Sequence, residues 1–310
     1  MTEPRRKRVV ALGEILWDII GNEKHVGGAP FNFAFHASQF GLDAWIVSRV
    51  GNDPPGQEML RAVKQMGLSS DHIQVDLRKP TGTVEVSVNL FGEPTFKIVK
   101  DVAWDYIAAT QAQHDLVRSA DVLWFGTLAQ RSEVSRQSIR ELIQTARSQP
   151  RKTLIVCGLN LRQHFFSAEL IRESLGFCNV LRLNEDEMKM VKGFFGRSRA
   201  SDREFARELL GTFGILLIAV THSARGCTLY TPDAEVRSLG FVVDVVDTVG
   251  SGRDFTAAMV VKLLEGAPFA EVARYANLTG AYVATQPGAT PRFSPFTLQR
   301  FELELESKRI

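Results

Sequence analysis

Short apolar, β-branched runs alternate with helical patterns along most of this chain. Strand-like runs cover residues 8–12, 44–50, 122–125, 153–156, 180–183 and 215–220, and helical patterns cover 30–40 and 55–66. Alternating β and α units form a mainly parallel sheet with helices on both faces. With 310 residues, of which 45% are hydrophobic, the chain can build one substantial core. We therefore expect a single α/β domain over residues 1–310.

Residues 81–100 interrupt this alternation. Val84 to Asn89 follow a period of two, and Phe91-Gly92-Glu93-Pro94 has the composition of a turn. This pattern predicts a β-hairpin. The residues alone leave open whether the hairpin lies on the main domain or belongs to a separate layer.

Polar residues and glycines follow several of the strand-like runs. In parallel α/β sheets, ligands bind beyond the carboxyl ends of the strands. We therefore expect the residues at these ends to converge on one site: Gly13, Asn160, Asn184, Thr221 and the 247–255 loop.

The segment from Val246 to Phe255, VDTVGSGRDF, lies between a strand-like run at 241–243 and a helical pattern at 255–261. Its glycines, Gly250 and Gly252, stand where the helix should begin. Backbone N–H groups at such a position point toward a bound anion. The segment is therefore a candidate phosphate-binding loop.

This loop resembles the DTxGAGDxF signature of the PfkB (ribokinase-like) carbohydrate kinases, and a second family signature appears at 27–34 with 50–56. The resemblance runs from about Val9 to about Pro291. Further segments resemble the fructokinase branch: 13–18, 92–96, 102–107, 160–162 and 184–187. The resemblance implies a ribokinase-like α/β fold with a mainly parallel sheet, helices on both faces and a small β lid. Lid strands are expected at about 15–22 and 81–100, and the lid is often the contact of a homodimer in this family.

By the same resemblance, the sugar is bound by Asp18, Gly28 and Asn32, with Arg162 as a further substrate-binding residue. A glycine allows close approach of the backbone, and a carboxylate or an amide can hydrogen-bond sugar hydroxyls. Read without the resemblance, Gly28 belongs to a turn that leads into a helix, and Asn32 lies on a solvated face.

The residues expected to bind the nucleotide are spread more widely along the sequence. Glu187, in the Asn-x-x-Glu pattern with Asn184, is expected near the Mg²⁺ of Mg-ATP, directly or through water. The same four residues also match a helix N-cap with an acidic first turn, and both interpretations can hold together. The remaining residues implied by the resemblance are Thr221, Gly226 and Asn277 for the nucleotide, and Asp247, Val249 and Gly288 for a monovalent cation such as K⁺.

One residue departs from the family pattern at the catalytic position. The expected general base is replaced by Arg253, which cannot accept a proton. Asp254 follows directly, and it is either a relocated base or an acid that stabilises the first turn of its helix. Gly250, Ser251 and Gly252 are expected to offer backbone N–H groups to the transferred phosphoryl group.

Two further departures concern the nucleotide half. Gly158 stands where the family's DxNxR motif has a carboxylate, and Ser223 replaces a glycine of the TxGxxG motif. We therefore consider two functions. The first is an ATP-dependent sugar kinase, fructokinase-like, that transfers the ATP γ-phosphoryl group to a sugar hydroxyl with Mg²⁺. The second is a catalytically disabled, sugar-binding pseudokinase with a sensing or regulatory role.

Charge and composition narrow the choice of partners. The net charge is +2, and the basic cluster Arg5-Arg6-Lys7-Arg8 is expected to be a solvated tail rather than a nucleic-acid patch. The sequence has three scattered cysteines, no apolar run near the ~20 residues that span a bilayer, and no apolar core of a secretory signal. We expect a cytoplasmic protein that binds a small sugar, with no nucleic-acid or membrane partner.

Overall fold

The central sheet combines a parallel body with an antiparallel edge. The computed structural model of the chain describes residues 5–20, 23–88, 94–247 and 251–307. The strand order is β13-β12-β11-β10-β9-β8-β1-β4-β5; neighbours from β5 to β11 are parallel, and β12 and β13 are antiparallel. These strands are β1 (Arg8–Leu12), β4 (Asp43–Gly51), β5 (Ile73–Asp76), β8 (Val122–Phe125), β9 (Leu154–Gly158), β10 (Val180–Asn184), β11 (Leu217–Thr221), β12 (Cys227–Tyr230) and β13 (Glu235–Ser238).

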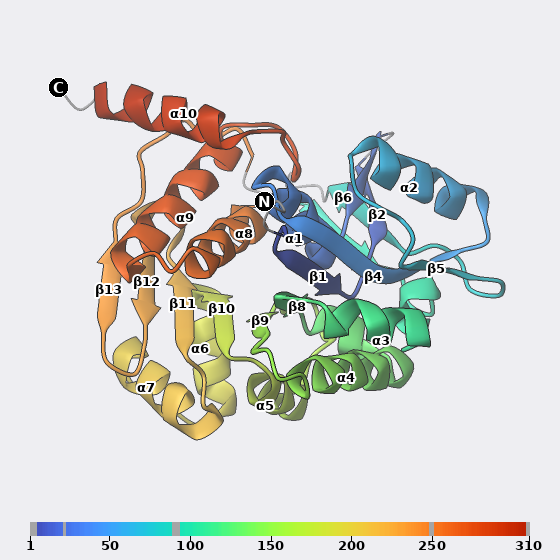
Figure 1. Ribbon diagram of the computed structural model, residues 1–310, viewed down its shortest axis with the longest axis horizontal. Coiled ribbons are helices and arrows are strands. Elements are labelled where there is room, and N and C mark those ends of the chain that lie inside the picture. Colours follow the sequence, from blue (N-terminus) through green and yellow to red (C-terminus); the bar gives the residue numbers. More distant parts are fainter. Residues whose placement is uncertain (1–4, 21–22, 89–93, 248–250, 308–310) are drawn as a thin grey trace.

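Helices cover both faces of this sheet (Figure 1). Because successive side chains of a strand point to opposite faces, Val10 and Leu12 of β1 pack into one hydrophobic cluster, and Val9 and Ala11 pack into the other. The helices are α1 (Ala29–Gln39), α2 (Pro54–Gln65), α3 (Gln111–Arg118), α4 (Glu133–Arg147), α5 (Ala168–Phe177), α6 (Glu185–Phe194), α7 (Asp202–Phe213), α8 (Ser251–Leu264), α9 (Phe269–Ala284) and α10 (Pro295–Ser307), with 3₁₀ turns η1 (Ala103–Tyr106), η2 (Leu128–Arg131) and η3 (Ser223–Arg225). The predicted mainly parallel α/β fold is confirmed.

A second, smaller sheet has the order β3-β2-β6-β7, with β2 (Leu16–Ile20), β3 (Glu23–Gly27), β6 (Thr83–Val88) and β7 (Pro94–Ile98). The strands β6 and β7 are the predicted hairpin, and β2 supplies the strand expected near 15–22. The predicted turn at 91–94 falls largely outside the described residues. The hairpin therefore belongs to a separate small sheet, as the family resemblance implied.

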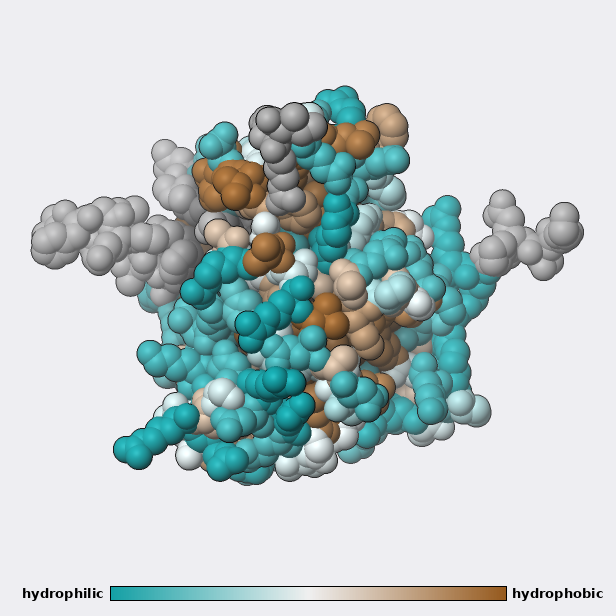
Figure 2. Space-filling view, turned by 90° about the vertical axis from the view of Figure 1, so that its left-hand side faces the viewer, coloured by the Kyte–Doolittle hydropathy of each residue, from teal (hydrophilic) through white to brown (hydrophobic). Residues whose placement is uncertain are grey.

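The strand-like run at 241–243 does not form a strand, and this prediction is wrong. β13 ends at Ser238, and residues 239–246 are not part of a strand. Val246 N–H donates to Ala284 O at the end of α9 (2.8 Å). Val242 is 93% exposed, so its apolar character does not mark a buried strand. Figure 2 views the molecule from the side of the β13 edge. It shows hydrophobic residues exposed on this surface among hydrophilic ones.

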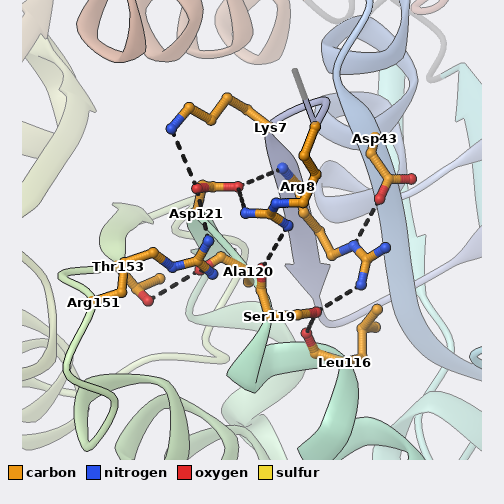
Figure 3. Close-up of polar contacts among 10 residues, drawn as sticks. Lys7, Arg8, Asp43, Leu116, Ser119, Ala120, Asp121, Arg151 and Thr153 are labelled. Atoms are coloured by element: carbon orange, nitrogen blue, oxygen red, sulfur yellow. Dashed lines mark hydrogen bonds and ion pairs between the residues drawn. The ribbon is translucent and has the colours of Figure 1, made fainter. Parts of the chain in front are cut away.

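The basic residues near the start of the described chain are exposed at Arg5, Arg6 and Lys7, as expected of a solvated segment. They are not a free tail, however, because several of them contact one carboxylate. Asp121, just before β8, accepts hydrogen bonds from Arg8 N–H (2.7 Å), Arg5 Nη2 (2.8 Å) and Arg151 Nη1 (3.0 Å), as Figure 3 shows. Lys7 Nζ lies 3.6 Å from the same carboxylate. This buried carboxylate ties the segment before β1 to β8 and to the loop that precedes β9.

We expect Asp121→Ala to lower the free energy of unfolding by about 1–3 kcal/mol, because a buried acceptor shared by three donors is lost. Urea denaturation of the variant measures this change. The control is Asp233→Ala, at an exposed loop position. Equal effects of the two substitutions would contradict the structural role of Asp121.

Among the described residues, no helix is long and apolar enough to cross a membrane.

Candidate active site

A cavity of about 220 Å³ lies at the carboxyl ends of β9 and β10, against the first turn of α8. This is the edge of the sheet where the sequence predicted convergence. Its wall consists of Trp124, Gly158, Asn160, Leu161, Arg162, Arg182, Asn184, Asp186, Glu187, Met190, Gly252, Arg253 and Thr256. A larger cavity of about 810 Å³ lies between residues 241–246 and the helices α9 and α10, and it contains none of the predicted site residues.

Glu187 and Asn184 form the predicted cap of α6, and the cap fixes the position of the carboxylate. Asn184 Oδ1 accepts from Glu187 N–H (2.8 Å), and Glu187 Oε2 accepts from Asn184 N–H (2.9 Å). The other oxygen of Glu187 accepts from Leu161 N–H (3.1 Å). Since both oxygens already bind backbone amides, a metal ion near this carboxylate is more easily held through water than by direct ligation. No cluster of three or more metal-ligating side chains occurs in the described part of the chain.

Arg182 of β10 is a site residue that we did not predict. Its Nη2 donates to Thr221 Oγ1 (2.9 Å), and its Nη1 lies 4.0 Å from Glu187 Oε2. The guanidinium packs so closely against Gly252 that a Cβ atom there would overlap with it. The sequence contained one indication of this residue, because an arginine stands within the apolar run 180–183. A charged residue is rarely found in a central strand unless it has a partner or a function there.

Arg253 faces the cavity. Its Nη2 donates to Asn160 Oδ1 (2.5 Å). Partial burial and the nearby charges of Arg162 and Arg182 lower the pKa of Arg253 to about 10, so it remains cationic at neutral pH. A positive charge therefore occupies the position at which the resemblance led us to expect a general base.

Asp254 is the next residue of α8. It is fully buried, does not line the cavity, and its Oδ1 accepts from Phe255 N–H (2.7 Å). Burial raises the pKa of Asp254 to about 7. Its Oδ2 has no hydrogen-bond partner among the described residues, and the two roles considered for Asp254, a relocated base or an acid of the first helical turn, both stay predictions.

The residues expected to bind the sugar lie together where β2, β3 and α1 meet. Gly28, the N-cap of α1, has φ +107, and a Cβ atom there would overlap with the carbonyl oxygen of Glu14. The Asp18 carboxyl group packs over Gly27, burial raises its pKa to about 6, and the charges of Arg253 and Arg162 oppose that rise. Asn32 is buried, and its Oδ1 has no hydrogen-bond partner among the described residues. An unpaired buried oxygen of this kind is suited to a ligand donor.

Glu14 and Asn160 connect the two halves of the site, although our sequence analysis gave neither a binding role. Glu14 Oε1 accepts from Ala29 N–H (3.2 Å) and from Asn160 Nδ2 (3.3 Å), while Asn160 Oδ1 accepts from Arg253. Oε2 of Glu14 has no partner among the described residues. A chain of polar contacts therefore leads from the start of α1 to Arg253.

Glu14 makes stability depend on pH. Burial raises its pKa from 4.5 to about 7. Between these values the folded chain retains a proton that the unfolded chain releases, so stability falls as pH rises through this window. Between pH 4.5 and 8, the free energy of unfolding of Glu14→Gln should therefore fall by about 3 kcal/mol less than that of the native chain. Urea denaturation at pH 4.5 and 8 tests this, with the exposed Glu133→Gln as control; equal pH dependence in both variants would contradict it.

The predicted nucleotide residues are engaged in local contacts. Asn277 Nδ2 donates to Ser238 O (3.1 Å) and Leu239 O (3.2 Å), and a Cβ atom on Gly226 would overlap with Ser238 O. Ser223 keeps a left-handed backbone, with φ +51, although it replaces a glycine. These contacts hold the loop after β11 against residues 238–240.

Two of the three residues predicted to bind a monovalent cation, Asp247 and Gly288, are in contact. Asp247 Oδ2 accepts from Gly288 N–H (3.1 Å). Val249 and Gly250 lie outside the described residues. The two segments named for a cation site are therefore in contact, and the cation site itself stays a prediction.

Proteins similar to this chain in sequence and in fold are sugar kinases. The pfkB family of carbohydrate kinases matches residues 7–295. Fructokinase-2 of Solanum habrochaites is 27% identical over 308 residues, covering 91% of this chain and 92% of that protein. An uncharacterised sugar kinase of Pyrococcus horikoshii in complex with ATP is 26% identical, with a TM-score of 0.80 over 92% of this chain and 95% of that chain. A fructokinase double mutant of Vibrio cholerae O395, in a fructose-, ADP- and potassium-bound form, is 23% identical and shares the fold, with a TM-score of 0.80 over 95% and 98% of the two chains.

Proposed function

This chain belongs to the pfkB family of carbohydrate kinases, and from that premise we propose that it is an ATP-dependent, fructokinase-like sugar kinase with slowed phosphoryl transfer. The substrate is a small sugar, with fructose as the first candidate because the curated relatives include fructokinases. The supporting observation is the continuity of the two half-sites through Glu14, Asn160 and Arg253.

The sugar is held between Asp18 and Asn32, with Gly28 allowing close approach of the backbone. The unpaired Oδ1 of Asn32 accepts a hydroxyl hydrogen, and an ionised Asp18 accepts others. Because the pKa of Asp18 is about 6, this carboxyl group is mostly ionised at neutral pH. We expect the small β sheet to act as a lid that excludes water, and to form the homodimer contact.

Bound Mg-ATP supplies the γ-phosphoryl group. The described residues fit this ligand: Glu187 lies at the cavity in a fixed orientation, and Arg182 and Arg162 bring positive charge to the wall. We propose that Gly250, Ser251 and Gly252 offer their N–H groups to the transferred group, that Thr221, Gly226 and Asn277 flank the nucleotide, and that Asp247, Val249 and Gly288 hold K⁺.

Arg253 cannot take the proton of the sugar hydroxyl, and Asp254 is buried and is not among the residues that line the cavity. Transfer then proceeds by positioning and charge neutralisation without a positioned base. A missing base costs about 10² to 10⁴ in rate. The alternative function, a sugar-binding pseudokinase with a sensing or regulatory role, is favoured by this same placement of Arg253 and Asp254.

A coupled assay of ADP release with Mg-ATP and fructose, in potassium buffer, tests the proposal. We expect slow, fructose-dependent release by the native chain and nearly the same kcat for Asp254→Asn, because Asp254 does not reach the cavity. A loss of about a hundredfold or more in Asp254→Asn, with an unchanged melting temperature, would instead identify Asp254 as a relocated base. Fructose that binds in calorimetry without any ADP release would support the pseudokinase.

A further inference from the structure

Three guanidinium groups line the 220 Å³ cavity: those of Arg162, Arg182 and Arg253. They come from three separate places, the loop after β9, the strand β10 and the first turn of α8. Burial is the main cause that lowers the pKa of Arg182 and of Arg253, and the like charges add to it: Arg162 acts on both groups, and Arg182 acts on Arg253. Holding three like charges around one cavity is unfavourable unless an anion compensates them.

Carboxylates near the cavity act in the opposite direction: Glu187 and Asp254 raise the pKa of Arg182, and Glu187 and Glu14 raise that of Arg253. Both oxygens of Glu187 accept backbone N–H groups, and its nearest approach to Arg182 is 4.0 Å. In the described part of the chain, neither Arg162 nor Arg253 has a carboxylate within 4.0 Å, and the hydrogen bond of Arg253 goes to the neutral amide of Asn160. The wall itself therefore carries three guanidinium groups against two carboxylates, those of Asp186 and Glu187, and two of the three guanidinium groups have no close ion pair.

Donor groups at the cavity also remain unused. Nε of Arg182 is buried without a partner among the described residues, and so is Nε1 of Trp124, which lines the same cavity. The guanidinium of Arg162 is exposed and donates no hydrogen bond to the described residues. Guanidinium groups match the geometry of a phosphate in pairs of parallel hydrogen bonds, whereas a neutral sugar needs no such charge.

We propose that Arg162, Arg182 and Arg253 form a preformed binding site for the phosphate group of a phosphorylated sugar. The remainder of such a ligand extends toward Asp18 and Asn32, and this part of the inference rests on the proposed sugar site. The chain then binds a sugar phosphate without nucleotide, and more tightly than it binds the free sugar. A sugar phosphate therefore competes with the free sugar for the site. The chain thereby responds to the phosphorylated form of the sugar.

Isothermal titration calorimetry without nucleotide tests this, with inorganic phosphate, fructose 6-phosphate, fructose 1-phosphate and fructose as separate titrants. We expect one of the two fructose phosphates to bind at least about tenfold more tightly than fructose. Inorganic phosphate alone is expected to bind at the same site, with an affinity that falls as ionic strength rises.

Arg162→Gln and Arg253→Gln are each expected to weaken phosphate binding by about tenfold to a hundredfold. Arg162 is exposed, so its substitution should leave folding intact, and melting temperatures verify this for both variants. Arg199→Gln, at an exposed position between α6 and α7, is the matched control and should change nothing. The proposal is overturned if phosphate does not bind, or if both site variants bind it as well as the control does.

These outcomes separate this proposal from the proposed function. Phosphate binding that depends on Arg162 and Arg253, without any fructose binding, would support the anion site and remove the sugar kinase proposal. Fructose binding with fructose-dependent ADP release, but without phosphate binding, would do the reverse.

Discussion

Arg253→Asp is expected to raise the kcat for phosphorylation of fructose by about 10²- to 10⁴-fold, the contribution of a positioned general base. The substitution places a carboxylate on the cavity wall, at the position where Arg253 now donates to Asn160. Arg162 and Arg182 remain beside it and stabilise its ionised form. Steady-state ADP release with Mg-ATP and fructose measures the gain, and the KM for fructose should change much less than kcat.

The matched control is Arg199→Asp, which makes the same change of charge at an exposed position. It should leave kcat unaltered. If Arg253→Asp binds fructose and Mg-ATP but remains as slow as the native chain, the lack of a base at this position is not what limits transfer.

Gly28→Ala is expected to abolish fructose binding and to lower the free energy of unfolding by about 3 kcal/mol or more. Gly28 has φ +107, and an added Cβ atom would overlap with the backbone oxygen of Glu14, which a side-chain rotation cannot relieve. The loop between β3 and α1 must therefore shift, and Asn32 and Asp18 shift with it. Urea denaturation and calorimetric titration with fructose measure the two effects.

Gly41→Ala separates backbone strain from overlap. Gly41 also has a positive φ, +79, but a Cβ atom there would meet nothing within 4 Å. We expect a loss of about 1 kcal/mol and intact fructose binding. Equal losses in the two variants would show that the close approach of Gly28 to Glu14 has no special role.

The sequence predicted the sheet well because its strands are buried on both faces. Continuous apolar runs such as 122–125 are typical of parallel strands, and the structure gives β8 the same bounds. The run 241–243 is also apolar, but it is not part of a strand, and Val242 is exposed. Local composition cannot distinguish these cases, because pairing is decided by distant segments.

Site residues could be predicted from the sequence where the backbone conformation requires a particular type of residue. Gly28 needs a positive φ, and Asn184 with Glu187 forms a reciprocal cap, so both leave a local pattern. Arg182 and Glu14 act through contacts with residues far away in the sequence, Thr221 for the first and Asn160 for the second. The direction of Arg253 relative to Asp254 depends on how α8 packs, which the order of residues alone left open.

We propose that the native chain is a sugar kinase that transfers phosphate slowly because Arg253 replaces the base. A rapid-quench experiment with γ-labelled Mg-ATP, saturating fructose and an excess of the native chain tests this most directly. The predicted result is labelled fructose phosphate that forms in a single slow phase, about 10²- to 10⁴-fold slower than with Arg253→Asp. The contradicting result is no labelled product from the native chain under conditions in which Arg253→Asp forms it, which would identify the native chain as a pseudokinase.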